Sequence, residues 1–359
     1  MDDFRLELCK LQLANMPNCR TRGVLDSARP SCFNRSIKKR QVNTVKIVVL
    51  DAKTLGEDLD LSHLNALGEV RIYPGTAPHE VEERLAGAEV AILNKTRINR
   101  QTVGEHPTLR MVAACATGYD NIDLAYCREQ GIAVANVKGY STQSVAQVTL
   151  AMGLSLFTNL PTYSTCVSSG EYTASGVANR LSPVYHELYG KTWGIVGYGN
   201  IGAQVARVVR AIGCRVIAYS RSEKQGVENV SLERLCRESD VISVHLPLSE
   251  QTRGIIGERE IAMMKKTAIL INVARGAVTD EAALAAAVAE GRIGGIGVDA
   301  YSVEPFPATH PFYAIRDLPN VCLTPHMAWG AKEARERCLA EVAENIAAFA
   351  RGERRNRVD

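Results

Sequence analysis

The sequence of 359 residues contains no run of eighteen uncharged apolar residues, so it predicts no membrane-spanning helix. Its start lacks the apolar segment of a signal peptide, and acidic residues beside Met1 argue against a transit peptide. The chain also has no strong excess of charge of one sign, because its formal net charge is only +3. Residues 1–44 hold nine basic and four acidic residues, which leaves 33 basic and 35 acidic residues in the remainder. A nucleic-acid-binding surface on the folded part is therefore not expected.

Paired cysteines are missing as well. The ten cysteines are scattered along the chain without a CxxC pair, so no zinc cluster and no other metal site is expected. Without a secretory signal, these cysteines are typical of free or buried thiols in a reducing compartment. We therefore expect a cytoplasmic protein.

Residues 1–44 have little hydrophobic patterning and contain Pro17, Gly23 and Pro30. We expect a disordered N-terminal extension, because such a segment buries too little apolar surface to fold. An organelle address or a docking segment is the alternative.

Apolar, β-branched runs then alternate with helical segments, which predicts a parallel α/β sheet. The expected strands of this first block are residues 45–52, 69–73, 88–94, 109–115 and 132–137, and its clearest helices are residues 79–87 and 121–131. A mostly apolar helix is expected at 141–161, too apolar all round for an exposed position, so we expect it to be buried between domains or subunits. Residues 162–190 are poorly patterned.

A second alternating block follows and predicts a second sheet. Its expected strands are residues 192–197, 215–220, 240–246, 268–273, 295–300 and 321–326. A helix is expected at 280–291, and an amphipathic helix at 332–352 ends the pattern. The fold class is thus α/β with two Rossmann-like parallel-sheet domains.

A glycine-rich loop opens the second block. The segment GYGNIG (197–202) follows an apolar strand and starts a helix, the context in which G-x-G-x-x-G binds a dinucleotide. Gly197 permits the tight turn, Gly199 lets the backbone approach the pyrophosphate, and Gly202 allows close helix–strand packing. Tyr198, Asn200 and Ile201 complete the expected cofactor loop, and the helix N-terminus favours the phosphates.

The end of the next strand bears on the choice of cofactor. NAD-binding proteins place an acidic residue there to accept a hydrogen bond from the ribose. This sequence has Ser220 and Arg221 instead, and an arginine can pair with a 2′-phosphate. We therefore favour NADP over NAD. In the alternative, Arg221 stacks on adenine and either cofactor binds.

Three residues at or beyond strand ends suggest catalysis. Arg275 follows the strand at 268–273, Glu304 lies beyond the strand at 295–300, and His326 ends the strand at 321–326. An arginine can grip a substrate carboxylate with two charged hydrogen bonds. A histidine is suited to donating a proton to a carbonyl oxygen, and a carboxylate partner fixes its tautomer. His245 is also near a strand end but lacks a matching acid, and we interpret it as structural.

Several motifs together resemble the D-isomer-specific 2-hydroxyacid dehydrogenases. They are GYGNIG, NVARGAVTDEAAL (272–284), GVDAYSVEP (297–305), LTPHMAWG (323–330), ATGYDNIDL (116–124) and GYSTQSVAQVTLAM (139–152). The resemblance extends over about residues 45–352. It implies that Arg275 binds the substrate, that Glu304 is the partner of the histidine, and that His326 donates the proton.

The resemblance also implies further contacts. Thr117 and Gly118 would offer backbone amides to the substrate carboxylate, with Lys95 of the NKT segment (94–96) beside them. Asp299 would meet the carboxamide of nicotinamide, and the remaining cofactor contacts would come from Pro247, Thr252, Val273 and Ala274. The implied domains are a substrate domain, 45–139, completed by the helix within 327–352, and a cofactor domain, 140–326. The implied assembly is a homodimer.

Within that family, NKT, CATGYDNID and PHMAWGAKEA are most similar to the glycerate dehydrogenase or hydroxypyruvate reductase branch. The expected reaction is therefore the reversible, NAD(P)H-dependent reduction of a small 2-keto acid to a D-2-hydroxy acid. Two alternatives stay open: a formate dehydrogenase, whose relatives usually carry Gln where Glu304 stands, and a non-metabolic dinucleotide sensor resembling corepressors of this fold.

Overall fold

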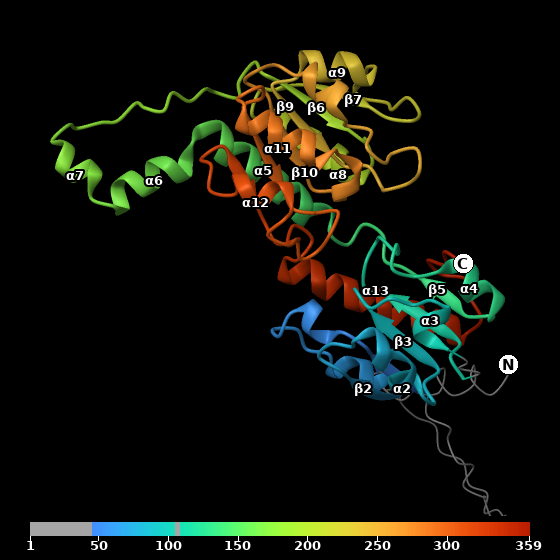
Figure 1. The fold of residues 1–359 in the computed structure, drawn as a ribbon. Coiled ribbons are helices and arrows are strands. Elements are labelled where there is room, and N and C mark those ends of the chain that lie inside the picture. The colour runs from blue at the N-terminus through green and yellow to red at the C-terminus, as the bar shows by residue number, and fades with distance from the viewer. Residues whose placement is uncertain (1–44, 105–107) are drawn as a thin grey trace, which may run out of the picture. The chain divides into compact units, whose positions relative to one another are not determined.

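The computed structural model describes residues 45–104 and 108–359, and the extension expected at 1–44 lies outside them. The chain divides into two compact units. Unit 1 runs to Lys138 and is completed by Arg335–Asp359, whereas unit 2 comprises Gly139–Ala334 (Figure 1). Each unit contains one parallel sheet, which confirms the predicted fold class.

Unit 1 contains a five-stranded sheet in the order β2-β1-β3-β4-β5. Its strands are β1 (Lys46–Val49), β2 (Glu69–Ile72), β3 (Val90–Leu93), β4 (Met111–Ala114) and β5 (Ala133–Ala135). Its short helices are η1 (Ala52–Leu55), η2 (Ser62–Ala66), η3 (Pro78–Glu80), α2 (Val81–Leu85), α3 (Arg100–Val103) and α4 (Leu124–Glu129). Every strand pair is parallel, so all five carboxyl ends lie at one edge.

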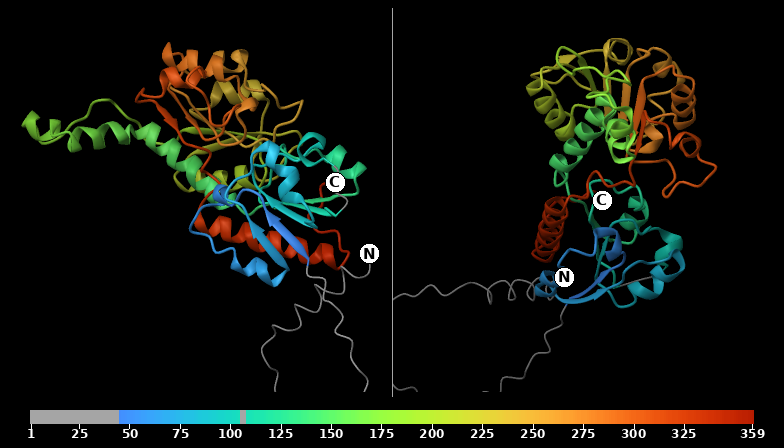
Figure 2. Two further views of the ribbon diagram at one scale, coloured as in Figure 1. Left: turned by 60° about the horizontal axis from the view of Figure 1, so that its bottom comes forward. Right: turned by 90° about the vertical axis from the view of Figure 1, so that its left-hand side faces the viewer.

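Two layers of helices cover this sheet. Val48, Leu93 and Val112 pack with Leu85 of α2 and Tyr126 of α4 in one buried cluster. The last helix, α13 (Lys332–Ala350), runs along the sheet of unit 1 (Figures 1 and 2). The side-chain amide of Asn345 on α13 donates a 3.1 Å hydrogen bond to the carbonyl of Asn136, just after β5. The end of the chain thus completes the domain that its beginning starts.

Unit 2 contains a seven-stranded parallel sheet in the order β12-β11-β10-β9-β6-β7-β8. The strands are β6 (Thr192–Val196), β7 (Arg215–Tyr219), β8 (Glu228–Asn229), β9 (Val241–Val244), β10 (Ile269–Asn272), β11 (Gly295–Val298) and β12 (Val321–Leu323). The order reverses between β6 and β9. Ligands of such sheets bind beyond the carboxyl ends of the strands at this reversal.

Alternating side chains of the strands bury both faces of this sheet. Trp193 and Ile195 pack on one side with α5 (Thr142–Thr158) and α8 (Asn200–Ala211). Val196 and Val244 pack on the other side. The elements beyond that side are α9 (Leu232–Glu238), α10 (Glu258–Ala262), η4 (Gly276–Val278), α11 (Glu281–Ala289) and α12 (Pro311–Ile315). Burial on both faces explains why these strands read as continuous apolar runs.

Residues 160–175 form two helices that the sequence pattern did not predict. These are α6 (Leu160–Ser168) and α7 (Glu171–Ser175), and they project from the body of unit 2 (Figures 1 and 2). Asn159, at φ 52°, ends α5 and redirects the chain. Only Cys166 is buried on α6, so no apolar stripe marks it in the sequence. The short strand β8 was also not predicted.

The long helix α5 packs against β10, β11 and α8 of its own unit. Burial of its inward side by this packing accounts for part of its apolar character. No helix in residues 45–104 and 108–359 is long and apolar enough to cross a membrane.

Candidate active site

Arg275 lies in a turn that the buried side chain of Asn272 holds in place. The Asn272 amide donates a 2.9 Å hydrogen bond to the carbonyl of Arg275, and its oxygen accepts 3.0 Å from the backbone N–H of Ala274. The guanidinium of Arg275 donates to the Ala274 carbonyl at 2.8 Å. Asn272 therefore shapes the segment that contains the expected substrate and cofactor residues Val273, Ala274 and Arg275, a role that the sequence pattern does not reveal.

Glu304 and His326 form an ion-pair geometry between the ends of two adjacent strands, β11 and β12. Nδ1 of His326 lies 2.7 and 2.8 Å from the two carboxylate oxygens of Glu304. The side chains are 21% and 29% exposed, so both stay reachable from solvent. Because a carboxylate only accepts hydrogen bonds, Nδ1 carries a proton. Nε2 lies on the opposite side of the ring.

The backbone around His326 is held by Asp299, which is buried. One carboxylate oxygen of Asp299 accepts hydrogen bonds from the Thr324 hydroxyl at 2.6 Å and from the Met327 N–H at 2.8 Å. The other oxygen accepts from the Ala328 N–H at 3.0 Å. His326 itself has φ 53°, a left-handed conformation that is uncommon for residues other than glycine. Asp299 thus fixes the backbone on both sides of a strained histidine; its contact with nicotinamide stays a prediction.

Tyr301 connects the Glu304 loop to the His326 segment, a role that sequence reasoning missed. Its N–H donates to Glu304 at 3.0 Å, and its hydroxyl donates to the Thr324 carbonyl at 2.8 Å. Burial, followed by the nearby carboxylates of Asp299 and Glu304, raises the pKa of Tyr301 well above its usual value. The hydroxyl therefore stays protonated and keeps donating at any physiological pH.

The glycine loop has the backbone shape expected of a phosphate-binding turn. Gly197 has φ 101°, and a Cβ there would lie 2.8 Å from the backbone of His245. A Cβ on Gly202 would lie 2.4 Å from the carbonyl oxygen of Gly197, so only glycine permits this packing of α8 on β6. Around Gly199, in contrast, a Cβ would meet nothing within 4 Å. That open space lies at the N-terminus of α8, as a pyrophosphate requires.

Ser220 and Arg221 lie beside this loop at the end of β7. The Ser220 hydroxyl accepts a 3.1 Å hydrogen bond from the N–H of Tyr198, and Arg221 is exposed directly after it. The segment from Pro247 to Thr252 is closed by a 2.6 Å hydrogen bond from the Thr252 hydroxyl to the Pro247 carbonyl. Val273 and Ala274 lie at the end of β10. All expected cofactor residues therefore belong to unit 2.

His245 belongs to a buried hydrogen-bond chain behind the glycine loop. The Trp193 indole donates to the Ser243 hydroxyl at 2.9 Å, and Ser243 lies 3.0 Å from Nε2 of His245. Burial lowers the pKa of His245 to about 3, so its imidazole is neutral at physiological pH. Nδ1 of this ring is buried without a hydrogen-bond partner among the described residues. An unsatisfied buried nitrogen beside an open glycine loop fits a site that receives a polar cofactor.

The expected substrate loops lie at the carboxyl edge of the sheet in unit 1. Asp51, after β1, accepts backbone hydrogen bonds from Asn94 at 2.9 Å and from Lys95 and Thr96 at 2.7 Å. Thr117, after β4, uses its hydroxyl to bond the Val137 carbonyl at 2.7 Å. Strands β3 and β4 are neighbours, so the loops holding Lys95, Thr117 and Gly118 are adjacent. Sequence reasoning missed Asp51, which shapes the first of them.

The structure thus gathers Arg275, Glu304 and His326 at the ends of three neighbouring strands of unit 2, β10, β11 and β12. Within residues 45–104 and 108–359 no group of three or more His, Cys, Asp or Glu side chains is arranged to hold a metal ion. The arrangement combines an arginine that can bind a carboxylate, a proton donor with its carboxylate partner, and a glycine-rich turn that can bind a dinucleotide.

Comparisons with known proteins found relatives over most of the chain. Residues 150–328 match the family model described as D-isomer specific 2-hydroxyacid dehydrogenase, NAD binding domain. The chain is 36% identical over 317 residues to a glycerate dehydrogenase of Methylorubrum extorquens, covering 88% of this chain and 99% of that protein.

Two solved structures share the fold at this level. A D-lactate dehydrogenase from Aquifex aeolicus, complexed with NAD and lactic acid, is 30% identical with a TM-score of 0.75 and covers 86% of this chain and 96% of its own. An acyclic imino acid reductase in complex with NADPH and D-Arg is 28% identical with a TM-score of 0.76, covering 88% and 100%.

Proposed function

The chain belongs to the D-isomer-specific 2-hydroxyacid dehydrogenase family, and on that basis we propose that it reduces a small 2-keto acid, of hydroxypyruvate or glyoxylate type, to the D-2-hydroxy acid. It is an NAD(P)-dependent oxidoreductase. The observation that carries the proposal is the 2.7 Å contact between Glu304 and Nδ1 of His326, beside the Arg275 turn. A proton donor with a fixed tautomer next to a carboxylate-binding arginine suits a keto acid.

Each residue of the site has its own role in the proposed reaction. Arg275 holds the substrate carboxylate and polarises the keto oxygen. We also assign substrate binding to Lys95, Thr117 and Gly118, as the family resemblance implies. When bound, the nicotinamide cofactor supplies the hydride that reduces the keto carbon. His326 donates its Nε2 proton to the developing alkoxide, while Glu304 stabilises the charged imidazole through Nδ1. The reverse direction uses the same groups, with His326 accepting the proton.

The substrate and the activity are tested together by one assay. Purified protein is offered hydroxypyruvate, glyoxylate, pyruvate and bulkier 2-keto acids, each with NADH and with NADPH. Turnover is expected with the small keto acids. Tight cofactor binding without turnover on any of them would contradict the proposal and favour a dinucleotide sensor.

The two units take separate parts in this proposal. Residues 45–139 with the helix in 327–352 form the substrate domain, and residues 140–326 form the cofactor domain. We place the protein in the cytoplasm, since the seven cysteines of the described residues are free thiols, as a reducing compartment would keep them.

Ser220 leads us to propose NADP as the preferred cofactor. A neutral hydroxyl that accepts the Tyr198 N–H leaves no charge to repel a 2′-phosphate, and the exposed Arg221 can pair with one. In Ser220→Asp, a carboxylate would accept from the ribose hydroxyl and repel the phosphate. We expect the ratio of kcat/KM for NADPH to that for NADH to fall about 10- to 100-fold, as one charged hydrogen bond implies.

The matched control for this prediction is Ser222→Asp, which adds the same charge two residues further along an exposed turn. It should change the ratio little. A parent protein that strongly prefers NADH, or a Ser220→Asp variant with an unchanged ratio, would contradict the NADP assignment.

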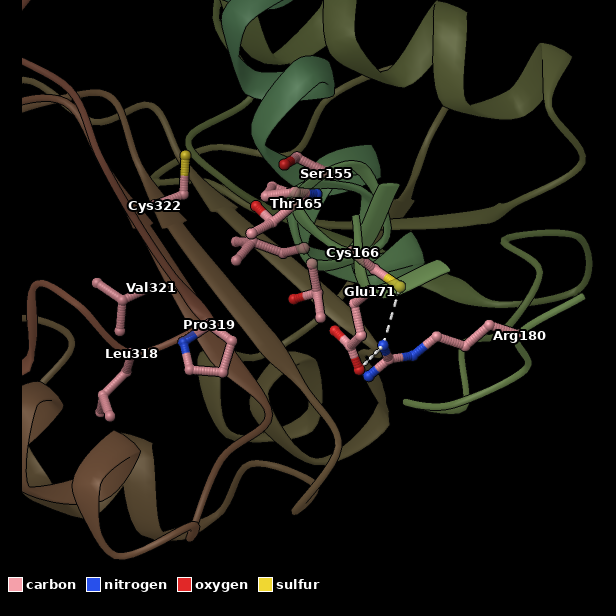
Figure 3. Close-up of a pocket in the computed structure, with 12 residues that line it drawn as sticks. Ser155, Thr165, Cys166, Glu171, Arg180, Leu318, Pro319, Val321 and Cys322 are labelled. Carbon is pink, nitrogen blue, oxygen red and sulfur yellow. Dashed lines mark hydrogen bonds and ion pairs between the residues drawn. The ribbon is translucent and has the colours of Figure 1, made fainter. Parts of the chain in front are cut away.

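We further propose that the chain forms a homodimer through the arm, defined as residues 160–190. Large apolar side chains are exposed along it, namely Leu160, Val167, Tyr172, Val177, Leu181, Val184, Tyr185 and Tyr189. A cavity of about 390 Å³ lies at the root of the arm, between it and residues 318–322 (Figure 3). There Arg180 pairs with Glu171 at 2.5 Å and contacts Cys166 at 2.9 Å. Exposed apolar surface of this kind marks a protein interface.

The dimer is tested by changing the two arm residues Leu181 and Val184, which are 74% and 73% exposed. The double variant Leu181→Asp/Val184→Asp should elute as a monomer in size-exclusion chromatography with light scattering, because charges cannot be buried unpaired in an interface. Ile72→Asp, at an exposed apolar residue of unit 1, is the control and should remain dimeric. A monomeric parent would overturn the assignment.

A further inference from the structure

A second buried acidic group lies beside the proposed active site and has no part in the mechanism above. Glu281, the first residue of α11, is only 9% exposed. One of its carboxylate oxygens accepts a 3.0 Å hydrogen bond from the N–H of Ser302. The other accepts from the Ser302 hydroxyl and lies 3.0 Å from Nε2 of His310. A buried carboxylate is costly unless donors surround it, and here three donors do.

The surroundings of His310 decide which of its nitrogens carries the proton. Its Nδ1 accepts a 3.3 Å hydrogen bond from the N–H of Phe312, which makes His310 the N-cap of α12. Nε2 must therefore be protonated to donate to Glu281. The ring is buried and contacts the aromatic rings of Tyr301, Phe306 and Phe312. His310 thus acts as a fixed neutral donor toward Glu281.

Ser302 ties this pair to the acid–base residues. It follows Tyr301, whose N–H donates to Glu304 at 3.0 Å and whose hydroxyl donates to the Thr324 carbonyl at 2.8 Å. Fixing Ser302 by both its N–H and its hydroxyl therefore fixes the start of the loop that carries Glu304.

The same carboxylate also lies against the arginine turn. A Cβ on Gly276, the residue after Arg275, would lie 2.1 Å from the N of Ser302 and 2.6 Å from a carboxylate oxygen of Glu281. The turn at 275–276, the start of α11 and the loop at 301–304 are therefore packed without space for one methyl group. A displacement of Glu281 would therefore move the turn at 275–276 and the loop at 301–304 as well.

We propose that Glu281, with His310 as its donor, is a positioning residue that sets Glu304 and His326 in register with Arg275. The proposal rests on the proposed function, because it assigns the residue that aligns that reaction's groups. Glu281 touches neither substrate nor cofactor in this account. It acts through Ser302 on the carboxylate that holds Nδ1 of His326.

The variant Glu281→Gln removes the charge of the side chain and one hydrogen-bond acceptor but keeps its size. Its oxygen can still accept from the Ser302 N–H, but its NH₂ group faces the Nε2–H of His310. His310 cannot relieve this by changing tautomer, because a proton on Nδ1 would then face the N–H of Phe312. The loop at 301–304 must shift, and a displacement of about 1 Å in a catalytic group can cost roughly 100-fold in rate.

The experiment is a pH profile of keto-acid reduction for the parent, Glu281→Gln and Glu304→Gln. Reduction requires protonated His326, so activity falls on the alkaline side of the profile, which we call the alkaline limb. Removing or displacing a carboxylate beside the imidazole disfavours its charged form. Glu281→Gln should lower kcat/KM about 10- to 100-fold. It should also move the alkaline limb to lower pH, in the direction of the shift in Glu304→Gln. Glu304, Asp299 and Tyr301 border the His326 segment and are unchanged in Glu281→Gln.

Glu290→Gln is the matched control, because Glu290 is an exposed residue at the end of the same helix. It should leave both kcat/KM and the limb unchanged. A merely structural role for Glu281 would lower the melting temperature but leave the limb in place. An unmoved limb with kcat/KM within about twofold of the parent would overturn the proposal.

Two variants of His310 keep the test valid if Glu281→Gln does not fold. In His310→Asn, the asparagine can still cap α12 but is too short to reach Glu281. In His310→Gln, the glutamine can donate its amide N–H to Glu281 but is a poor N-cap. We expect His310→Asn to move the alkaline limb and His310→Gln to leave it near the parent's position. The opposite order would show that the cap alone matters and would overturn the proposal.

A readout without turnover separates this inference from the proposed function. The pH at which His326 titrates is followed by NMR of histidine-labelled protein, with His326→Asn used to assign its signal. A lower midpoint in Glu281→Gln supports the positioning role even if no keto acid is reduced. An unchanged midpoint in a protein that does reduce keto acids contradicts the positioning role alone.

Discussion

His326→Asn is expected to lower kcat/KM for keto-acid reduction about 100- to 10,000-fold, the range that a positioned general acid contributes. We choose asparagine rather than alanine because of the backbone conformation of His326. His326 has φ 53°, and asparagine tolerates the left-handed region better than other residues with a side chain. Its amide can also still donate to Glu304. The variant therefore removes the proton donor while keeping the backbone conformation and a hydrogen bond to Glu304.

The measurement is steady-state kinetics with the best keto acid, together with cofactor binding by fluorescence. Cofactor affinity should stay near that of the parent, because the glycine loop is untouched. His79→Asn, at an exposed histidine of unit 1, is the control for the substitution itself. Near-parental turnover in His326→Asn would refute its place as proton donor.

Arg275→Ala is expected to have a comparable effect for a different reason. Two hydrogen bonds to a carboxylate, each worth about 1.5–3 kcal/mol, correspond to a loss of roughly 100- to 10,000-fold in kcat/KM. KM for the keto acid should rise, because the carboxylate is held before and during reaction. The guanidinium is preoriented by its 2.8 Å hydrogen bond to the Ala274 carbonyl.

Arg275→Lys distinguishes the forked grip from positive charge alone. Lysine keeps the charge but not the planar pair of donors, so it should recover only part of the lost activity. Arg259→Lys, at an exposed arginine that pairs with Glu233, is the matched control. A lysine variant within about twofold of the parent would show that Arg275 does not grip a carboxylate with two bonds.

The sequence predicted much of the site because its parts are local. The glycine turn depends on three glycines within six residues, and Gly197 has the positive φ that such a turn requires. The strand ends could be located because each buried strand is a short apolar run. Side chains that follow such runs in a parallel sheet meet at one edge, which is why the sequence alone predicts Arg275, Glu304 and His326 as site residues.

Other features could not be read from local patterns. The helices α6 and α7 bury few side chains, so their sequences show no apolar periodicity. The sequence pattern therefore did not predict them. Asn272, Tyr301 and Asp51 look like ordinary residues in or beside strands. Their importance comes only from the backbone groups that they bond in other segments.

By itself, the sequence determined two parallel α/β sheets, the place of the dinucleotide turn and the three strand-end residues, because each depends on neighbours along the chain. The tertiary structure alone decided that Nδ1 is the nitrogen of His326 that contacts Glu304, 22 residues away, and that Asp299 bonds the backbone around that histidine. It also alone decided that Glu281 reaches Ser302 across 21 residues. Contacts between distant segments follow from how strands and loops pack against one another, and local hydrophobic periodicity carries no record of that packing.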